Sequence, residues 1–311
     1  MTAKLRVAVI GVGHLGRHHA RILGSLEGAT LVGVVDAKAD RASEIAAGCG
    51  TVAVRSASDL LGQVDAVSIA VPTEAHLAVA MPFLQHGIPV LVEKPLARDV
   101  SEADAMIDAA ARAGVVLAVG HTERYNPAVA AAARYLDNPR FIEVHRLGTF
   151  PERSLDIDVV FDLMIHDLDL VLSLVPSEVS SIEAVGVPVL TGRVDIANAR
   201  LRFENGCIAN ITASRISRDR TRKIRFFQQD AYLSIDYAAQ EVEMYRLVRG
   251  QERPAIDGGK LDVLREEPLK RELADFLGAV REGRRPLVAG EDGRRALALA
   301  QRITERMAAG N

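Results

Sequence analysis

Short apolar runs alternate with amphipathic stretches over residues 1–120. Apolar runs of this length are typical of strands buried on both faces, and they comprise Val7–Ile10, Leu31–Val35, Ala66–Ala70, Val90–Val92 and Val115–Val119. Stretches with helical spacing lie between them, at Leu15–Leu23, Asp40–Ala47, Ala75–Leu84 and Ser101–Ala113. The alternation predicts an α/β fold whose first domain, residues 1–120, is a doubly wound parallel sheet. Pro82 lies inside the third helix and is expected to kink or shorten it.

The pattern changes after residue 120. A short helix, the strand-like run Phe141–Leu147 and a helix over Val159–Leu174, stopped by Pro176, come first. Further strand candidates then follow in series, at Ile182–Val187, Ile196–Phe203, Ile208–Ser214, Lys223–Gln228, Ala231–Asp236 and Val242–Leu247, with a hairpin predicted at Asn205–Gly206 and a loop at Gly250–Gly259. The series predicts an antiparallel or mixed open sheet in an α+β second domain, residues 121–311. Two predicted helices, Leu269–Arg281 and Asp292–Ala308, end the chain. We assign them to the second domain and keep packing against the first domain as the alternative.

Composition narrows the class of protein. The chain has 311 residues, 49% of them hydrophobic, and a formal net charge of −3, so it can bury two cores and carries no charge excess suited to nucleic acid. No apolar run approaches the roughly 20 residues of a membrane span, and we expect no leader peptide. The two cysteines, Cys49 and Cys207, lack metal-site spacing and suit a reducing compartment. We expect a cytoplasmic protein with no metal, no membrane partner and no nucleic-acid partner.

Three glycines follow the first apolar run with the spacing G-x-G-x-x-G, at Gly11, Gly13 and Gly16. In a strand–turn–helix unit the first permits a tight turn, the second lets a pyrophosphate approach the backbone, and the third lets helix and strand pack closely. The helix that follows offers free N–H groups and a partial positive charge to phosphates. Because strand and helix flank the glycines in this order, a dinucleotide site is favoured over a purely structural turn.

Asp36 ends the second apolar run, twenty residues after the third glycine. A carboxylate at this place accepts hydrogen bonds from both ribose hydroxyls of NAD and repels the 2′-phosphate of NADP. The alternative is an ordinary turn residue, since Asp also favours turns. We predict NAD rather than NADP as the cofactor, with Lys38 and Arg41 close enough to moderate the preference.

Polar residues follow three successive strands of the first domain, at Val71–His76, Glu93–Pro95 and Gly120–Pro127. The carboxyl ends of parallel strands meet at one edge, where such folds bind ligands. Lys94 at such a strand end is placed to polarise a hydroxyl or carbonyl oxygen and to transfer a proton if desolvation lowers its pKa. The alternative is a solvated surface lysine.

Asp162 and His166 are spaced by four residues on a predicted helix of the second domain, which puts them on one face. There Asp162 can orient the imidazole of His166 while the other ring nitrogen accepts a substrate proton. A salt-bridged helix face is the alternative. No further ligand of suitable spacing supports a metal site, and we interpret Asp167 and Asp169 as surface acids.

A basic cluster lies between residues 215 and 225, with one acid, Asp219, among six cations, Arg215, Arg218, Arg220, Arg222, Lys223 and Arg225. Arginine pairs well with phosphate, so the cluster suits a diphosphate. A charged strand edge or a subunit contact remains the alternative.

Together these motifs resemble one family, the glucose–fructose oxidoreductase, inositol dehydrogenase and MocA-like (Gfo/Idh/MocA) group. The resemblance rests on G-V-G-H-L-G, on E-K-P at Glu93–Pro95, on D-x-x-x-H at Asp162–His166 and on P-L-V-A-G-E-D-G-R-R-A-L at Pro286–Leu297. It implies a Rossmann domain followed by an open sheet that carries the substrate and the oligomer contacts. It also implies catalysis by Lys94, Asp162 and His166, and a cis Lys94–Pro95 bond. It further implies a cofactor lining of Gly11, Val12, Gly13, His14, Leu15, Gly16, Asp36, Val71, Pro72, Thr73, His76, Glu93, Lys94 and His121. Met164 stands where the family often has glycine, so we expect a differently shaped pocket there.

Two further runs, Gly120–Ala128 and Val194–Gly206, resemble those of bacterial members that act on nucleotide sugars. This implies hydride transfer to nicotinamide from a sugar hydroxyl, such as C3 of UDP-N-acetylglucosamine, with substrate contacts from Arg124, Tyr125, Asn126 and Arg222. A cyclitol, a free sugar or an imine is the alternative substrate, and a non-catalytic dinucleotide-binding regulator is the alternative class. An open sheet exposes apolar area unless it pairs, so we expect a homodimer or homotetramer.

Overall fold

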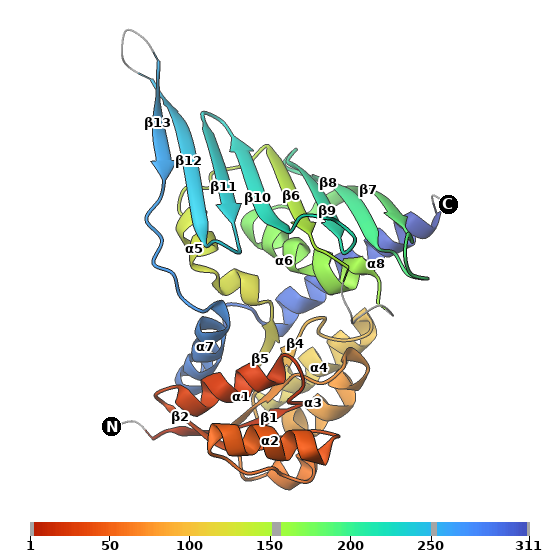
Figure 1. Cartoon of the computed structure of the whole chain (residues 1–311), viewed down its shortest axis with the longest axis vertical. Coiled ribbons are helices and arrows are strands. Elements are labelled where there is room, and N and C mark those ends of the chain that lie inside the picture. Colours follow the sequence, from red (N-terminus) through yellow and green to blue (C-terminus); the bar gives the residue numbers. More distant parts are fainter. Residues whose placement is uncertain (1–2, 151–156, 250–253, 310–311) are drawn as a thin grey trace. The chain divides into compact units, whose positions relative to one another are not determined.

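The computed structural model describes residues 3–150, 157–249 and 254–309 (Figure 1). The chain divides into two compact units, each with its own sheet. The first unit comprises Met1–Thr122 and Glu267–Arg294, and the second comprises Glu123–Glu266 and Arg295–Asn311. The stretch Glu267–Arg294, which the division at residue 120 assigned to the second domain, therefore belongs to the first unit.

The first unit is built on a five-stranded parallel sheet with the order β2-β1-β3-β4-β5. Its strands are β1 (Leu5–Ile10), β2 (Ala29–Val35), β3 (Ala66–Ile69), β4 (Val90–Glu93) and β5 (Leu117–Gly120). Its helices are α1 (Gly16–Ser25), α2 (Ala39–Cys49), α3 (His76–Gln85), α4 (Val100–Ala113) and α7 (Pro268–Glu282), and α3 continues for three residues beyond Pro82. The predicted doubly wound sheet is confirmed. Its strand order reverses at β1 and β3, where such folds bind ligands.

Helix α7 belongs to the first unit because one of its faces completes the core there. Leu273, Phe276 and Leu277 have the i, i+3, i+4 spacing of a helix face and are buried. They join a cluster with Val7 and Val9 of β1. Burying each of these side chains contributes about 1.5–3 kcal/mol, so the first unit depends on residues far along the chain.

The second unit is built on an eight-stranded sheet with the order β13-β12-β11-β10-β6-β9-β8-β7. All neighbours pair antiparallel except β6 and β9, which are parallel. The strands are β6 (Phe141–Leu147), β7 (Val179–Val187), β8 (Ile196–Phe203), β9 (Ile208–Ser214), β10 (Thr221–Gln228), β11 (Ala231–Asp236), β12 (Glu241–Val248) and β13 (Ala255–Lys260). The predicted series of strands in a mixed sheet is confirmed, including the turn at Asn205–Gly206 between β8 and β9.

Helices α5 (Pro127–Ala133), α6 (Ile165–Leu174) and the part of α8 (Gly290–Ala309) from Arg295 onward lie along one face of this sheet (Figure 1). Alternate strand residues, such as Ile142 and Val144 of β6, pack in a core with apolar side chains of these helices. The other face carries a row of aromatic rings whose neighbouring centroids are 5.2–6.4 Å apart, formed by Phe141, Phe227, Tyr232 and Tyr245. The helix-covered face therefore holds the core, and the opposite face presents aromatic surface.

Two elements differ from the sequence-based expectation. The predicted loop over residues 250–259 is wrong for its second half, because Ala255–Lys260 forms the edge strand β13 by pairing with β12; residues 250–253 lie outside the described residues. The sequence A-I-D-G-G-K carries no alternation of apolar side chains, so backbone pairing alone reveals this strand. The predicted regular helix over 159–174 begins instead with a π turn, Val160–Met164, before α6. Among the described helices, none combines the length and apolarity needed to cross a bilayer.

Candidate functional site

The glycine loop between β1 and α1 has the geometry that each glycine was expected to provide. Gly11 has φ +83°, and a Cβ there would lie 2.7 Å from the carbonyl oxygen of Ala70. A Cβ on Gly16 would lie 1.8 Å from the carbonyl oxygen of Gly11. By contrast, a Cβ on Gly13 would meet no atom within 4 Å. The first and third glycines are therefore required by the fold, while the second leaves open space at the start of α1 for a phosphate.

Asp36 follows β2 and is held in one orientation by the backbone. Its Oδ2 accepts a hydrogen bond from Val12 N–H (2.9 Å), and its Oδ1 accepts one from Lys38 N–H (2.9 Å). Each oxygen keeps a lone pair for a ribose hydroxyl. Arg41 donates to the carbonyl oxygen of Val12 (3.0 Å) and pairs with Glu44 (2.7 Å). The loop, the start of α1 and this carboxylate together fit a dinucleotide with an unmodified ribose.

A buried hydrogen-bonded chain lies beneath Lys94. The imidazole of His19 contacts Ser68 Oγ through Nδ1 (2.8 Å) and Glu93 Oε1 through Nε2 (3.0 Å), and Glu93 Oε2 accepts a hydrogen bond from Lys94 N–H (3.3 Å). Burial acts to raise the pKa of the Glu93 carboxyl, but His19 and Lys94 outweigh it and hold that pKa below its ordinary value. Sequence reasoning missed His19 and Ser68, since neither stands in a motif. The chain fixes the backbone from which the Lys94 side chain extends.

His76 joins the ends of β3 and β4. Its Nε2 lies 3.0 Å from the carbonyl oxygen of Val71, and its Nδ1 lies 3.0 Å from that of Pro95. The Lys94–Pro95 bond is cis, as the resemblance implied. Burial is the main cause of a lowered pKa at His76. Because the ring is buried and both of its nitrogens contact backbone carbonyl oxygens, it stabilises the loops next to Lys94. His121, at the end of β5, is buried as well.

In the second unit, Asp162 lies in the π turn and His166 in the first turn of α6. Both side chains are half-buried. π turns inserted in helices frequently occur at functional sites. Met164 between them is fully buried in the core below α6, so its side chain fills the helix–sheet interface.

Asp167 and Asp169 are not surface acids, and that interpretation was wrong. Both are buried on α6. Arg146 of β6 donates two hydrogen bonds to Asp167 (2.7 and 2.9 Å), and Arg124 pairs with Asp169 (3.3 Å). The arginines stand 21 and 45 residues away in sequence, so no local pattern reveals the pairs.

Three of the predicted substrate residues lie in or beside the turn Thr122–Tyr125 that precedes α5. Arg124 pairs with Asp169, as described, and Tyr125 is buried. Asn126 caps α5 by accepting a hydrogen bond from Ala128 N–H (3.0 Å) and donates to the carbonyl oxygen of Tyr237 (3.1 Å). These contacts give Asn126 a structural role. Arg222, the fourth predicted residue, is exposed on β10.

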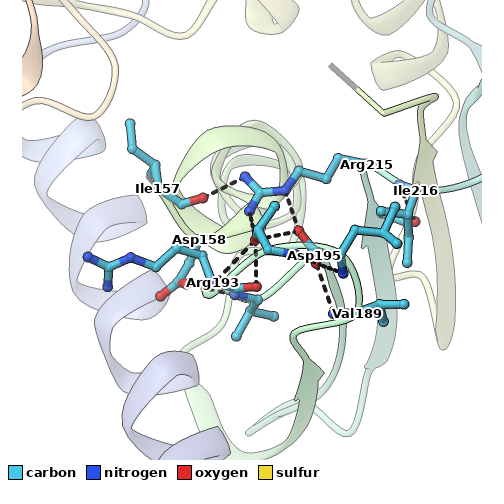
Figure 2. Close-up of polar contacts among 11 residues, drawn as sticks. Ile157, Asp158, Val189, Arg193, Asp195, Arg215 and Ile216 are labelled. Atoms are coloured by element: carbon cyan, nitrogen blue, oxygen red, sulfur yellow. Dashed lines mark hydrogen bonds and ion pairs between the residues drawn. The ribbon is translucent and has the colours of Figure 1, made fainter. Parts of the chain in front are cut away.

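The basic cluster between residues 215 and 225 separates into three groups. Arg215 is buried and pairs with Asp195 (2.8 Å), as Figure 2 shows. Lys223 pairs with Asp236 (3.4 Å) and Arg225 with Glu143 (2.7 Å) across neighbouring strands. The exposed members are Arg218, Arg220 and Arg222. Among the residues that the structure describes, no three His, Cys, Asp or Glu side chains gather as metal ligands.

Comparison with known proteins agrees with this geometry. The model described as "Oxidoreductase family, NAD-binding Rossmann fold" matches residues 5–121, and the "GFO/IDH/MocA C-terminal domain" matches residues 130–234. The chain is 42% identical over 307 residues to the UDP-N-acetylglucosamine 3-dehydrogenase of Acidithiobacillus ferrooxidans, covering 96% of each protein. A solved structure of that enzyme superposes with a TM-score of 0.93 at 41% identity, covering 99% of each chain. The myo-inositol 2-dehydrogenase of Thermotoga maritima is 26% identical over 314 residues, covering 95% of this chain and 94% of that one.

Proposed function

Because the chain belongs to the Gfo/Idh/MocA family of NAD-binding oxidoreductases, we propose that it oxidises the C3 hydroxyl of UDP-N-acetylglucosamine. The main support for this proposal is the sequence identity of the chain, over nearly its full length, to an enzyme named for that reaction. The weaker likeness to the inositol enzyme favours a nucleotide sugar over a cyclitol. Lys94, Asp162 and His166 are all present, which disfavours a non-catalytic regulator.

The proposed roles follow from the chemistry of each side chain. The glycine loop and Asp36 would hold NAD, which when bound would supply the hydride acceptor for the carbon that bears the hydroxyl. His166 accepts the hydroxyl proton on one ring nitrogen. Asp162 holds the tautomer of that ring, and the ammonium group of Lys94 stabilises the negative charge that develops on the oxygen.

Arg222 is the member of the basic cluster that we assign to the substrate diphosphate. It is exposed on the helix-covered face of β10, directly opposite Arg146 of β6. Burial raises the pKa of Asp167, the residue after His166; Arg146 is the main group that lowers it, and the charge of Arg222 adds a smaller lowering effect. A guanidinium close to the helix that carries His166 is suited to hold a phosphate group.

The experiment that tests this function is turnover of UDP-N-acetylglucosamine by the purified protein, followed by reduced nicotinamide. An amine donor and a sugar aminotransferase in the assay remove the ketone and draw the oxidation forward. We expect reduction of NAD, and we expect Arg222→Gln to raise KM for the nucleotide sugar about tenfold, the scale of one charge-assisted hydrogen bond. NAD binding without turnover would overturn the substrate assignment, and cyclitols and free sugars would be screened next.

We further propose that the aromatic face of the second sheet meets a second copy of the chain. Phe227 and Tyr245 are exposed there, and the nearby charges, Lys223 with Asp236 and Arg225 with Glu143, are neutralised in pairs. Such a face can pair with itself without like-charge repulsion. Light scattering at micromolar concentration is expected to give a dimer or tetramer, and a monomer would contradict the proposal. A cytoplasmic location accords with the free thiols of Cys49 and Cys207.

A further inference from the structure

Arg146 lies at the centre of a buried charge cluster immediately beyond His166. It occupies the helix-covered face of β6 and is 4% exposed. Its guanidinium forms the two-pronged contact with Asp167 and approaches Glu123 Oε1 (3.2 Å). It also lies over the ring of Tyr237, 5.4 Å from the ring centroid. Burial acts to lower the pKa of Arg146, but Asp167 and Glu123 outweigh it, so that pKa lies above its ordinary value.

Arg215 forms a second buried cluster at the other end of the same segment (Figure 2). It donates to Asp195 Oδ1 (2.8 Å), to Thr191 Oγ1 (3.0 Å) and to the carbonyl oxygen of Ile157 (2.7 Å). The other oxygen of Asp195 accepts three backbone N–H groups, from Val189, Leu190 and Thr191, at 2.6–2.9 Å. One arginine thus joins the end of β9, the turn before β8 and the chain just before the π turn.

The entry to the π turn is further fixed by paired backbone contacts. Asp158 Oδ1 accepts a hydrogen bond from Val194 N–H (3.0 Å), and Val159 N–H donates to the carbonyl oxygen of Val194 (3.0 Å). The carbonyl oxygen of Asp158 in turn accepts the N–H of Asp162 (3.1 Å). The backbone of Asp162 is therefore tied, through two residues, to the cluster around Arg215.

The segment 157–167 is consequently held at both ends, with Asp162 and His166 between. A helix advances about 100° per residue, so the direction of His166 follows from that of Asp167. A two-pronged arginine–carboxylate contact fixes both the height and the rotation of the helix at Asp167. Buried ion pairs can often be replaced by apolar residues without loss of stability, so stability alone does not account for two of them here.

We propose that Arg146 and Arg215 are positioning residues, which clamp the π turn and the start of α6 so that Asp162 and His166 hold their catalytic orientation. This proposal rests on the proposed function, in which His166 accepts the substrate proton. A displacement of about 1 Å in a reacting group can cost about 10²-fold in rate, so small shifts in this segment are sufficient.

The test replaces the whole Arg146 pair, because removing one partner leaves a buried charge and can prevent folding. In Arg146→Met with Asp167→Leu we expect kcat to fall about 10–100-fold, with unchanged NAD affinity and a retained thermal transition. The matched control is Arg246→Met with Asp257→Leu, an exposed pair at the edge of the same sheet (2.8 Å), which is expected to keep kcat. Arg215→Lys keeps the charge but lacks the fork, and we expect it to lower kcat as well.

A double-mutant cycle separates positioning from a merely structural effect. If Arg146 acts through His166, its pair replacement should have little further effect on the residual rate of His166→Gln. Wild-type kcat in the pair variant, or an equal loss in both backgrounds, would overturn the proposal. Wild-type turnover in His166→Gln alone would overturn instead the proposed role of His166 as general base, and NAD binding without turnover by the unmodified protein would overturn the proposed function, so these failures are distinguishable.

Discussion

Replacing His166 by glutamine is expected to lower kcat by about 10²–10⁴-fold, the usual contribution of a positioned general base. Glutamine keeps a polar side chain of similar reach but cannot accept a proton at neutral pH, so the hydroxyl must lose its proton to water. Lys94→Met is expected to cause a loss of similar scale, because it removes the charge opposite the developing alkoxide. Steady-state rates with NAD and UDP-N-acetylglucosamine measure both.

The affinity for NAD is the control for these variants. We assign NAD to the glycine loop and Asp36, so calorimetry should show its binding to His166→Gln unchanged. The acidic limb of the pH–rate profile should also disappear in this variant, because that limb reports the protonation of the general base. Undiminished turnover in both variants would remove Lys94 and His166 from the catalytic set.

Replacing Asp36 by serine is expected to lower kcat/KM for NAD by about 10²–10⁴-fold. Two hydrogen bonds from ribose hydroxyls to a carboxylate are lost, each worth about 1.5–3 kcal/mol, and every 1.4 kcal/mol corresponds to a factor of ten. The 2′-phosphate of NADP is no longer repelled, and Lys38 lies two residues away to receive it. The ratio of kcat/KM for the two cofactors should therefore move toward NADP.

Asp36→Asn is the matched variant, since it removes the charge but keeps the shape and one acceptor oxygen. That oxygen can still accept the N–H of Val12 or of Lys38, which preserves part of the loop geometry. We expect its cofactor ratio to lie between those of the wild type and the serine variant. An unchanged ratio in Asp36→Ser would show that the carboxylate does not select the cofactor.

The features that sequence predicted well are those whose chemistry is local. Gly11, Gly13, Gly16 and Asp36 lie within one strand–helix–strand unit, so their spacing carries the geometry. The strands of the second sheet could likewise be predicted, because apolar residues such as Ile142 and Val144 alternate along the strand with less buried ones. In both cases the residue type and its spacing, rather than one particular distant side chain, set the geometry.

The features that sequence did not predict depend on distant partners. Asp167 looked like a surface acid because its compensating charge, Arg146, comes from another element. Arg215 belongs to a basic run that sequence alone would place in solvent, whereas in the structure it is buried in an ion pair with Asp195. The π turn gave no signal either, since its residues suit a regular helix and tertiary contacts decide between the two. Buried ion pairs between distant elements are thus where reading from sequence was least informative here.

Helix α7 belongs to the first unit although it is late in the sequence, and this affects how that unit forms during synthesis of the chain. The core around β1 lacks Leu273, Phe276 and Leu277 until these residues have been translated, about 150–155 residues after the preceding part of that unit ends at Thr122. At about 5–20 residues per second a ribosome takes about 8–30 s over that interval. During this time a nascent Rossmann sheet exposes an apolar face, which is the kind of surface that holding chaperones recognise. Synthesis rate and chaperone supply, rather than the stability of the finished protein, should therefore limit its soluble yield.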